Sequence, residues 1–147
     1  MFLGTHEHTI DKKGRINIPA KFRDVLIKKY DERLIITNFY GCLRAYPYDE
    51  WQSLVNEINS YSSFDEEAIK LERYFYPNAV ECSMDKQGRV LIPQNLREYA
   101  KLEKEVVVVG LSKKMEIWNK DKWLEVQKDL SENFEKIRSQ FVKKGLI

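Results

Sequence analysis

An internal duplication constrains the fold of this chain more than any other feature of its sequence. The segment Thr9–Pro19 returns as Ser83–Pro93 at an offset of 74 residues, with Asp, Lys, Gly, Arg, Ile and Pro at identical spacing. A second pair of matching segments, Leu43–Trp51 and Met115–Trp123, follows at an offset of 72 residues. Because chance matches of this length in the same order are improbable, the sequence predicts two copies of one module.

The strands of each module can be placed from its turn residues. A short strand leads into Asp-Lys-x-Gly-Arg, whose Asp and Gly favour a turn. A β-branched strand follows, Arg15–Ile18 or Arg89–Ile92, so each unit is typical of a hairpin. A further strand pair completes each module. We expect these pairs at Leu34–Asn38 with Leu43–Tyr46 and at Val106–Val109 with Met115–Trp118.

A short helix is predicted inside each module. Pro19 and Pro93 stand where a helix can begin, because the first helical turn needs no proline N–H. An arginine recurs four residues later, at Arg23 and Arg97. The apolar face of these helices is expected to comprise Phe22, Val25 and Leu26 in the first copy, and Leu96 and Ala100 in the second.

Longer helices are predicted between and after the copies. Apolar side chains recur at helical spacing over Trp51–Ile58. Ser63 and Glu66 have the spacing of a capping box before a second helix, which Pro77 ends. Helical spacing returns over Trp123–Phe141, which predicts a long amphipathic helix. Its apolar stripe is expected to pack within the chain or between subunits.

The fold class is therefore α+β and β-rich, with four segments. We expect a first module in residues 1–51, connecting helices in 52–77, a second module in 78–123 and a C-terminal helix in 124–147. Hydrophobic residues make up 43% and charged residues 33% of the chain, which indicates a soluble globular protein. No apolar run could span a bilayer and no signal peptide is recognisable, so we expect a cytoplasmic protein without a membrane partner.

Charge is unevenly distributed although the net charge is only +2. Residues 1–30 hold seven Lys/Arg against three Asp/Glu, whereas residues 45–82 hold two against eight. Such segregation allows one surface to attract phosphate while another faces protein or solvent. Cys42 and Cys82 lack metal-ligand spacing and are interpreted as small, half-buried apolar residues.

Motifs of catalysis are not found. The chain has no Gly-rich phosphate loop, His-Glu-x-x-His or Gly-x-Ser-x-Gly segment. Its two histidines, His6 and His8, lack the further ligands that zinc needs and are interpreted as ordinary surface residues. We therefore expect no enzyme activity, no metal, no cofactor and no small-molecule substrate. Trp51, Trp118 and Trp123 are interpreted as core or subunit contacts.

At Asp11–Arg15 and Asp85–Arg89 the sequence resembles the AbrB-like (SpoVT-AbrB), swapped-hairpin fold. The doubled module, the start Met1–Gly4 and the placement of the helices narrow this resemblance to the MraZ family, over essentially the whole chain. The resemblance implies two modules that interleave as a β-barrel core with peripheral helices and assemble into a ring-shaped homo-oligomer. It also implies a nucleoid-associated transcriptional regulator that binds direct repeats of double-stranded DNA upstream of its own operon, a division and cell-wall gene cluster.

The resemblance also assigns the contact with DNA to the two signature loops. The family's arginines fall on Arg15 and Arg89 and its aspartates on Asp11 and Asp85. Lys13 matches a basic loop position at which the second copy has a glutamine, so equal contact by both loops is an open question. With the chemistry described next, the candidate DNA-binding residues are Arg15, Arg89, Lys13, Lys12, Lys86 and Gln87.

Elementary chemistry agrees with such an assignment. A two-stranded ribbon fits the major groove, and arginine pairs bidentately with O6 and N7 of guanine. Lysines in the loops are better suited to phosphate, which positions a protein without specifying sequence. Linking several loops raises avidity by about 10²–10⁴. The residues expected to be structural in the loops are Asp11 and Asp85, which close the turn or orient the arginine, and Gly14 and Gly88, which keep the turn small.

A protein-interaction module is the alternative function. AbrB-like folds also serve antitoxins, which bind DNA weakly and a toxin strongly. A disordered, partner-clamping tail would favour that function. Here a second complete module occupies the place of such a tail, and the chain ends in a predicted helix, which favours the regulator.

Overall fold

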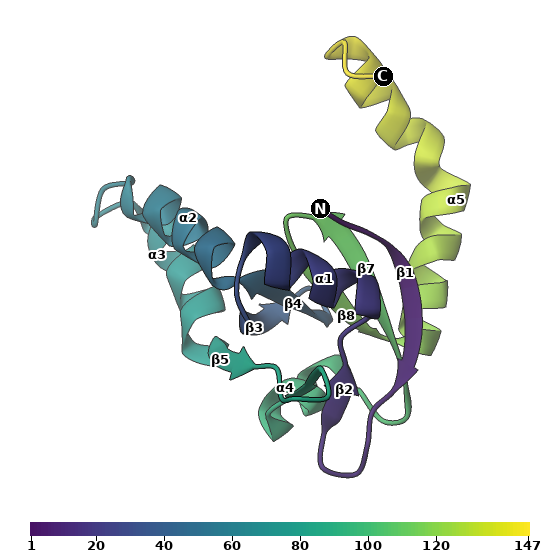
Figure 1. Cartoon of the computed structure of the whole chain (residues 1–147). Coiled ribbons are helices and arrows are strands. Elements are labelled where there is room, and N and C mark those ends of the chain that lie inside the picture. Colours follow the sequence, from purple (N-terminus) through teal and green to yellow (C-terminus); the bar gives the residue numbers. More distant parts are fainter.

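A six-stranded antiparallel sheet and a separate two-stranded ribbon form the body of the protein, surrounded by helices (Figure 1). The computed structural model describes all residues, Met1–Ile147. The strands are β1 (Phe2–Thr9), β2 (Arg15–Asn17), β3 (Arg33–Phe39), β4 (Cys42–Pro47), β5 (Val80–Ser83), β6 (Arg89–Leu91), β7 (Glu105–Ser112) and β8 (Met115–Asn119). The helices are α1 (Ala20–Lys29), α2 (Tyr48–Asn59), α3 (Glu66–Phe75), the 3₁₀ helix η1 (Tyr76–Asn78), α4 (Gln94–Ala100) and α5 (Lys120–Lys143). The α+β class is thus confirmed.

Strands of one copy pair with strands of the other in both sheets. The large sheet has the order β1-β7-β8-β4-β3-β5, so β1 of the first copy lies against β7 of the second, and β5 lies against β3. The ribbon joins β2 to β6. The later hairpins, β3 with β4 and β7 with β8, form within each copy as the sequence predicts.

The hairpin predicted around each signature loop is therefore wrong as a pair of bonded strands. The strands before and after the loop, β1 and β2, take their partners from the second copy rather than from each other. Ile16 and Val90 face each other at the centre of the ribbon and are both 1% exposed. Pairing across the copies thus directs one apolar side chain from each strand into the core. The same alternation of apolar and polar residues would also suit a local hairpin.

The main hydrophobic core belongs to both copies at once. Its twenty buried residues include Phe22 and Leu26 of α1, and Leu96 and Ala100 of α4, which are the helix faces that the sequence predicts. Pro19 and Pro93 directly precede these two helices. Because both copies contribute side chains to one core, neither can bury its apolar surface alone.

The helices between the copies differ from the prediction in one respect. Helix α2 buries Trp51 and Ile58 as expected, and α3 ends before Pro77. Its start is not the predicted capping box at Ser63. Asp65 is the N-cap instead, and its carboxylate accepts a hydrogen bond from the Ala68 N–H. An aspartate cap satisfies a free N–H of the first turn without a reciprocal partner, which explains the correction.

Helix α5 is the long helix that the tail predicts, but none of its residues is buried. Its first turns pack on the body through Trp123 and Val126, which contact the small cluster around the buried Trp118. Beyond these turns the helix projects away from the sheet (Figure 1). No helix of the protein is both long enough and apolar enough to cross a membrane.

The two cysteines are buried and unpaired. Cys42 is fully buried, and burial raises the pKa of the Cys82 thiol to about 11. At neutral pH the Cys82 side chain is therefore a neutral thiol, and it contributes to the main core as a small apolar residue.

Candidate nucleic-acid interface

Asp11 organises the first signature loop through both of its carboxylate oxygens. Its Oδ1 accepts hydrogen bonds from the backbone N–H groups of Lys13, at 3.0 Å, and Arg15, at 2.8 Å. Its Oδ2 accepts the Nε–H of Arg15 at 2.7 Å. The aspartate thus closes the turn with one oxygen and orients the arginine with the other.

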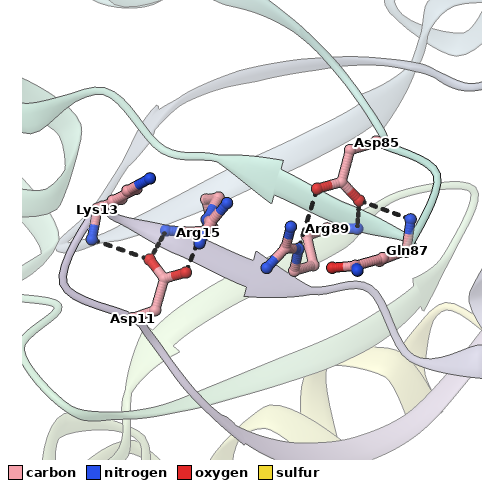
Figure 2. A network of polar contacts seen from close by, with 6 residues as sticks. All are labelled: Asp11, Lys13, Arg15, Asp85, Gln87 and Arg89. Carbon is pink, nitrogen blue, oxygen red and sulfur yellow. Dashed lines mark hydrogen bonds and ion pairs between the residues drawn. The ribbon is translucent and has the colours of Figure 1, made fainter.

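The second loop repeats this arrangement. Asp85 Oδ1 accepts the N–H groups of Gln87 and Arg89, and its Oδ2 accepts Nε of Arg89, each at 2.9 Å. The backbone N–H of the signature arginine, followed by its guanidinium, lowers the pKa of both aspartates. Figure 2 shows the two loops at opposite ends of the ribbon, with the arginines lying between the aspartates.

The terminal nitrogens of both signature arginines are available for a ligand. Among the side-chain nitrogens of Arg15 and Arg89, only the two Nε atoms donate hydrogen bonds within the protein. Their side chains are 29% and 27% exposed. Because its two Nη groups are unbonded, each guanidinium retains a pair of donors for a ligand while its aspartate holds Nε.

The ribbon displays both arginines on one face. In the antiparallel register Arg15 lies opposite Leu91 and Asn17 lies opposite Arg89, whereas the residues between them point into the core. The outer face consists of these four side chains alone. It is joined to the loops by two further bonds, from Ile18 N–H to the carbonyl of Gly88 at 2.9 Å and from Ile92 N–H to that of Gly14 at 2.8 Å.

Two arginines outside the signature, Arg97 and Arg23, pack against the glycines of the loops. A Cβ on Gly14 would lie 2.6 Å from Cζ of Arg97, and one on Gly88 would lie 2.4 Å from Cδ of Arg23. Arg23 donates to the Ile18 carbonyl at 2.8 Å. Each loop therefore rests on an arginine from the helix of the other copy. Their recurrence four residues after each proline was the sequence signal for this role.

The glycines of both loops have conformations that explain their presence. Gly14 has φ +91° and Gly88 has φ +76°, the left-handed region that favours glycine. Each is buried against the arginine below it. A larger residue would be strained by its backbone and would also displace the guanidinium.

The remaining predicted side chains lie at the loop tips. Lys12, Lys13, Lys86 and Gln87 are all exposed, and none makes a side-chain hydrogen bond or ion pair. The structure thus gathers every predicted site residue into one surface formed by two loops and the ribbon between them. The loops are not identical, because the first has two free ammonium groups and the second has one.

The two histidines lie on β1, near Phe22 and Arg23 of α1. His6 packs edge-on against Phe22 with ring centroids 5.0 Å apart. His8 is half-buried, and burial, followed by the neighbouring His6 and Arg23, lowers its pKa. The chain has no group of three or more His, Cys, Asp or Glu side chains placed to hold a metal ion.

Comparison with known proteins places these loops in a family. The family model described as "MraZ protein, putative antitoxin-like" matches twice, at residues 1–74 and 75–144. A protein of Pelotomaculum thermopropionicum named transcriptional regulator MraZ is 44% identical over 97% of this chain and 96% of its own length. The protein of the same name from Lachnoclostridium phytofermentans is 47% identical over 84% of each chain.

One further relative covers the full length, since the transcriptional regulator MraZ of Pediococcus pentosaceus is 41% identical over 99% of this chain and all of its own. Among solved structures, the solution structure of PHS018 from Pyrococcus horikoshii matches 76% of this chain and 91% of that one, at 17% identity and a TM-score of 0.36. This likeness is too low to assign a fold or a function. The two family matches and the full-length relatives are decisive, and the chain belongs to the MraZ family.

Proposed function

We propose that this protein is a sequence-specific, DNA-binding transcriptional regulator that contacts DNA through its two signature loops and the ribbon between them. One observation carries the proposal: two arginines, each bonded through Nε to its own aspartate, lie on one face of the ribbon with their Nη groups unbonded. The relatives named transcriptional regulator MraZ support the regulatory role.

The proposed contact follows from the shape and charge of this surface. A two-stranded ribbon enters the major groove, where each arginine offers its Nη pair to O6 and N7 of a guanine. Lys12, Lys13 and Lys86 lie at the loop tips, where they would meet phosphates. The oxygens of the aspartates are occupied by the loop and the arginine, and the paired guanidinium offsets their charge next to the DNA.

One ribbon does not supply enough affinity for a specific complex. Each bidentate contact contributes about 1–3 kcal/mol. Dissociation constants of about 10⁻⁸–10⁻¹¹ M require roughly 11–15 kcal/mol. Two arginines fall short of this, so the proposal includes several ribbons on one assembly, bound to direct repeats of one DNA.

Helix α5 is the element proposed to form that assembly. Beyond its first turns, its stripe of exposed apolar side chains comprises Leu130, Phe134 and Ile137, each 37–49% exposed. The single chain offers no surface against which this stripe is buried, so we propose that a second copy covers it. A head-to-tail contact of this kind closes into a ring when the rotation between copies permits. A Phe134→Glu variant should then shift the mass measured by light scattering towards the monomer.

The finer parts of the proposal come from the family. The target is the DNA upstream of the protein's own gene in a division and cell-wall cluster, with the protein cytoplasmic and nucleoid-associated. The strand exchange between β1–β7 and β2–β6 is proposed to be the single-chain form of an interleaved AbrB-like barrel. The four segments 1–51, 52–77, 78–123 and 124–147 are retained as a proposed division of the chain.

Fluorescence anisotropy on the DNA upstream of the protein's own gene tests the proposal. A scrambled duplex and a salt series serve as controls. We expect tighter binding to the native duplex that persists at physiological salt. Arg15→Ala and Arg89→Ala should each cost about 1–3 kcal/mol on the native duplex and much less on the scrambled one. Equal losses on both duplexes would remove the arginines as base readers.

A protein partner is the second candidate function, favoured by the antitoxin-like description of the family. The turn between α2 and α3 exposes Tyr61 and Phe64, which are 63% and 89% exposed and could contact another protein. Purification discriminates the two functions. An antitoxin-type module should carry a small protein partner in stoichiometric amount, whereas the proposed regulator should carry nucleic acid.

A further inference from the structure

The ribbon is symmetric in its backbone. The pair formed by Ile16 and Val90 marks a local two-fold axis, because the pairs on either side of it are exchanged by that axis. Equivalent hydrogen bonds have nearly equal lengths in the two loops. The Asp11 N–H donates to the Arg15 carbonyl at 3.0 Å, and the Asp85 N–H donates to the Arg89 carbonyl at 2.8 Å. The backbone alone therefore gives DNA two equal halves.

The side chains on the outer face break this symmetry. Asn17 and Leu91 occupy equivalent positions of the two copies, 74 residues apart. The first half of the face thus pairs Arg15 with a leucine, and the second pairs Arg89 with an asparagine. Side chains directly opposite each other on one face lie about 4.5–5.5 Å apart at Cβ, so each forms one unit with its arginine.

Neither residue is explained by the fold. Leu91 is 56% exposed in the middle of a polar surface, and its strand neighbours on either side are buried. Asn17 is exposed, and its amide makes no hydrogen bond within the protein. The apolar side chain of Leu91 and the side-chain amide of Asn17 are therefore both available to a partner outside the chain.

We infer that Asn17 and Leu91 read different bases, so that the ribbon recognises its DNA in one direction; this inference rests on the proposed function. The carboxamide of Asn17 matches N6 and N7 of adenine, and the side chain of Leu91 matches the methyl group of thymine. The arginine neighbouring each of them reads a guanine. One ribbon then binds a site whose two halves differ, not a palindrome.

The loop tips reinforce the direction. Lys13 and Gln87 are also equivalent positions, so the half of the surface nearer the first loop has one additional positive charge. Contact of Lys13 with phosphate strengthens that end of the site without specifying a base. Base choice itself is assigned to the ribbon residues, which separates the two contributions.

Selection of binding sites from a random duplex library tests the inference directly. The wild-type protein should enrich a motif with unequal halves. Leu91→Asn makes the two halves of the ribbon face identical in side-chain type, and it should enrich a palindromic motif with adenine in both. Asn17→Leu should give the converse palindrome. Both positions are exposed, so folding of each variant is checked by its thermal transition.

Anisotropy with the two selected duplexes gives the magnitude. The wild-type protein should prefer its own unequal duplex over the palindrome of the Leu91→Asn variant by about tenfold, and the variant should reverse this preference. A palindromic wild-type motif, or an unchanged motif in both variants, overturns the inference. If Arg15→Ala still abolishes selection in that case, the proposed function stands. If the wild-type protein enriches no motif, both fall.

Discussion

Two of the strand pairs that join the copies, β4 with β8 and β2 with β6, are each formed by equivalent strands of the two copies, and these two pairs differ in their charges. In the sheet, Arg44 of the first copy lies opposite Glu116 of the second, although the two positions correspond in the duplication. On the ribbon, the equivalent positions hold arginine in both copies. The equivalent positions in the sheet thus hold opposite charges, whereas those on the ribbon hold the same residue.

Burial explains the difference. The Arg44–Glu116 ion pair, with Nε and Oε2 3.0 Å apart, has side chains only 20% and 10% exposed. The indole of Trp118 donates to the other oxygen of the glutamate at 3.0 Å. Two like charges there would face each other without solvent. In a duplicated chain, two equivalent positions that face each other can hold opposite charges. In identical subunits related by a two-fold axis, the same two positions hold the same residue.

The ribbon needs no such complement inside the molecule. Arg15 and Arg89 each have an aspartate of their own loop, and their Nη groups make no bond within the protein. Complementarity between the copies thus accompanies mutual contact, whereas the identical arginines fit the external partner that we propose for both. Asn17 and Leu91 are unlike and yet face outward, which is why they suggest a partner with unequal halves.

Removing one member of the buried pair should have the largest effect. Glu116→Ala leaves Arg44 without its counter-charge and the Trp118 indole without its acceptor, and we expect a loss of about 3 kcal/mol in the free energy of unfolding. Urea denaturation measures it. Arg44→Met combined with Glu116→Leu should recover the part of the loss that comes from the uncompensated arginine, but not the part that comes from the Trp118 indole. A cost below about 1 kcal/mol for the single variant would show that the pair matters little.

Gly14→Ala should have the next largest effect, and Gly41 supplies a matched control. Gly14 and Gly41 have φ +91° and +84°, but only a Cβ at Gly14 meets another atom within 4 Å, the Arg97 guanidinium. Alanine in this backbone region costs about 1–2 kcal/mol at either position. Because the buried end of Arg97 must move to admit the methyl group, we expect a larger loss of stability for Gly14→Ala than for Gly41→Ala, and weaker DNA binding only for Gly14→Ala. Equal binding by both variants would deny Arg97 a supporting role.

These residues also show how far the sequence alone could lead. The duplication predicted the later hairpins and both short helices, because spacing repeats wherever structure repeats. It could not assign the partners of β1 and β2, since alternation in Arg15–Asn17 suits a strand in either copy. Arg23 and Arg97 were visible as a recurrence, but only the positions of Gly88 and Gly14 above them give that recurrence a meaning.

Asp11→Asn should affect the arginine more than the turn. An amide oxygen can still accept the backbone bonds of Lys13 and Arg15, but the amide nitrogen cannot accept Nε of the arginine. We expect little change in the thermal transition and a loss of about fivefold in affinity for the native duplex. Asp85→Asn is the control in the other loop. A collapse of stability would assign the carboxylate to the turn alone.

The pH dependence of binding checks the same ion pairs in the unmodified protein. The pKa of Asp11 and of Asp85 is lowered in the folded state, first by the arginine N–H and then by the guanidinium. Their contribution to stability is therefore complete above the ordinary aspartate pKa of about 3.9 and is lost as the pH falls through the lowered values. Anisotropy should show a constant preference for the native duplex from about pH 5 to pH 8. A decline within that range would require another titrating group.

Lys13→Gln should have the smallest effect, and it completes the comparison because it makes the first loop equal to the second. Lys13 is exposed and unpaired, as is Gln87, so the change removes one positive charge and no internal contact. If Lys13 meets phosphate, native and scrambled duplexes lose affinity about equally, and the slope of log K against log salt decreases by about one per ribbon engaged. Gln87→Lys should increase the slope by the same amount. A loss confined to the native duplex would instead make Lys13 a base reader, and the asymmetry between the loops would then belong to sequence recognition itself.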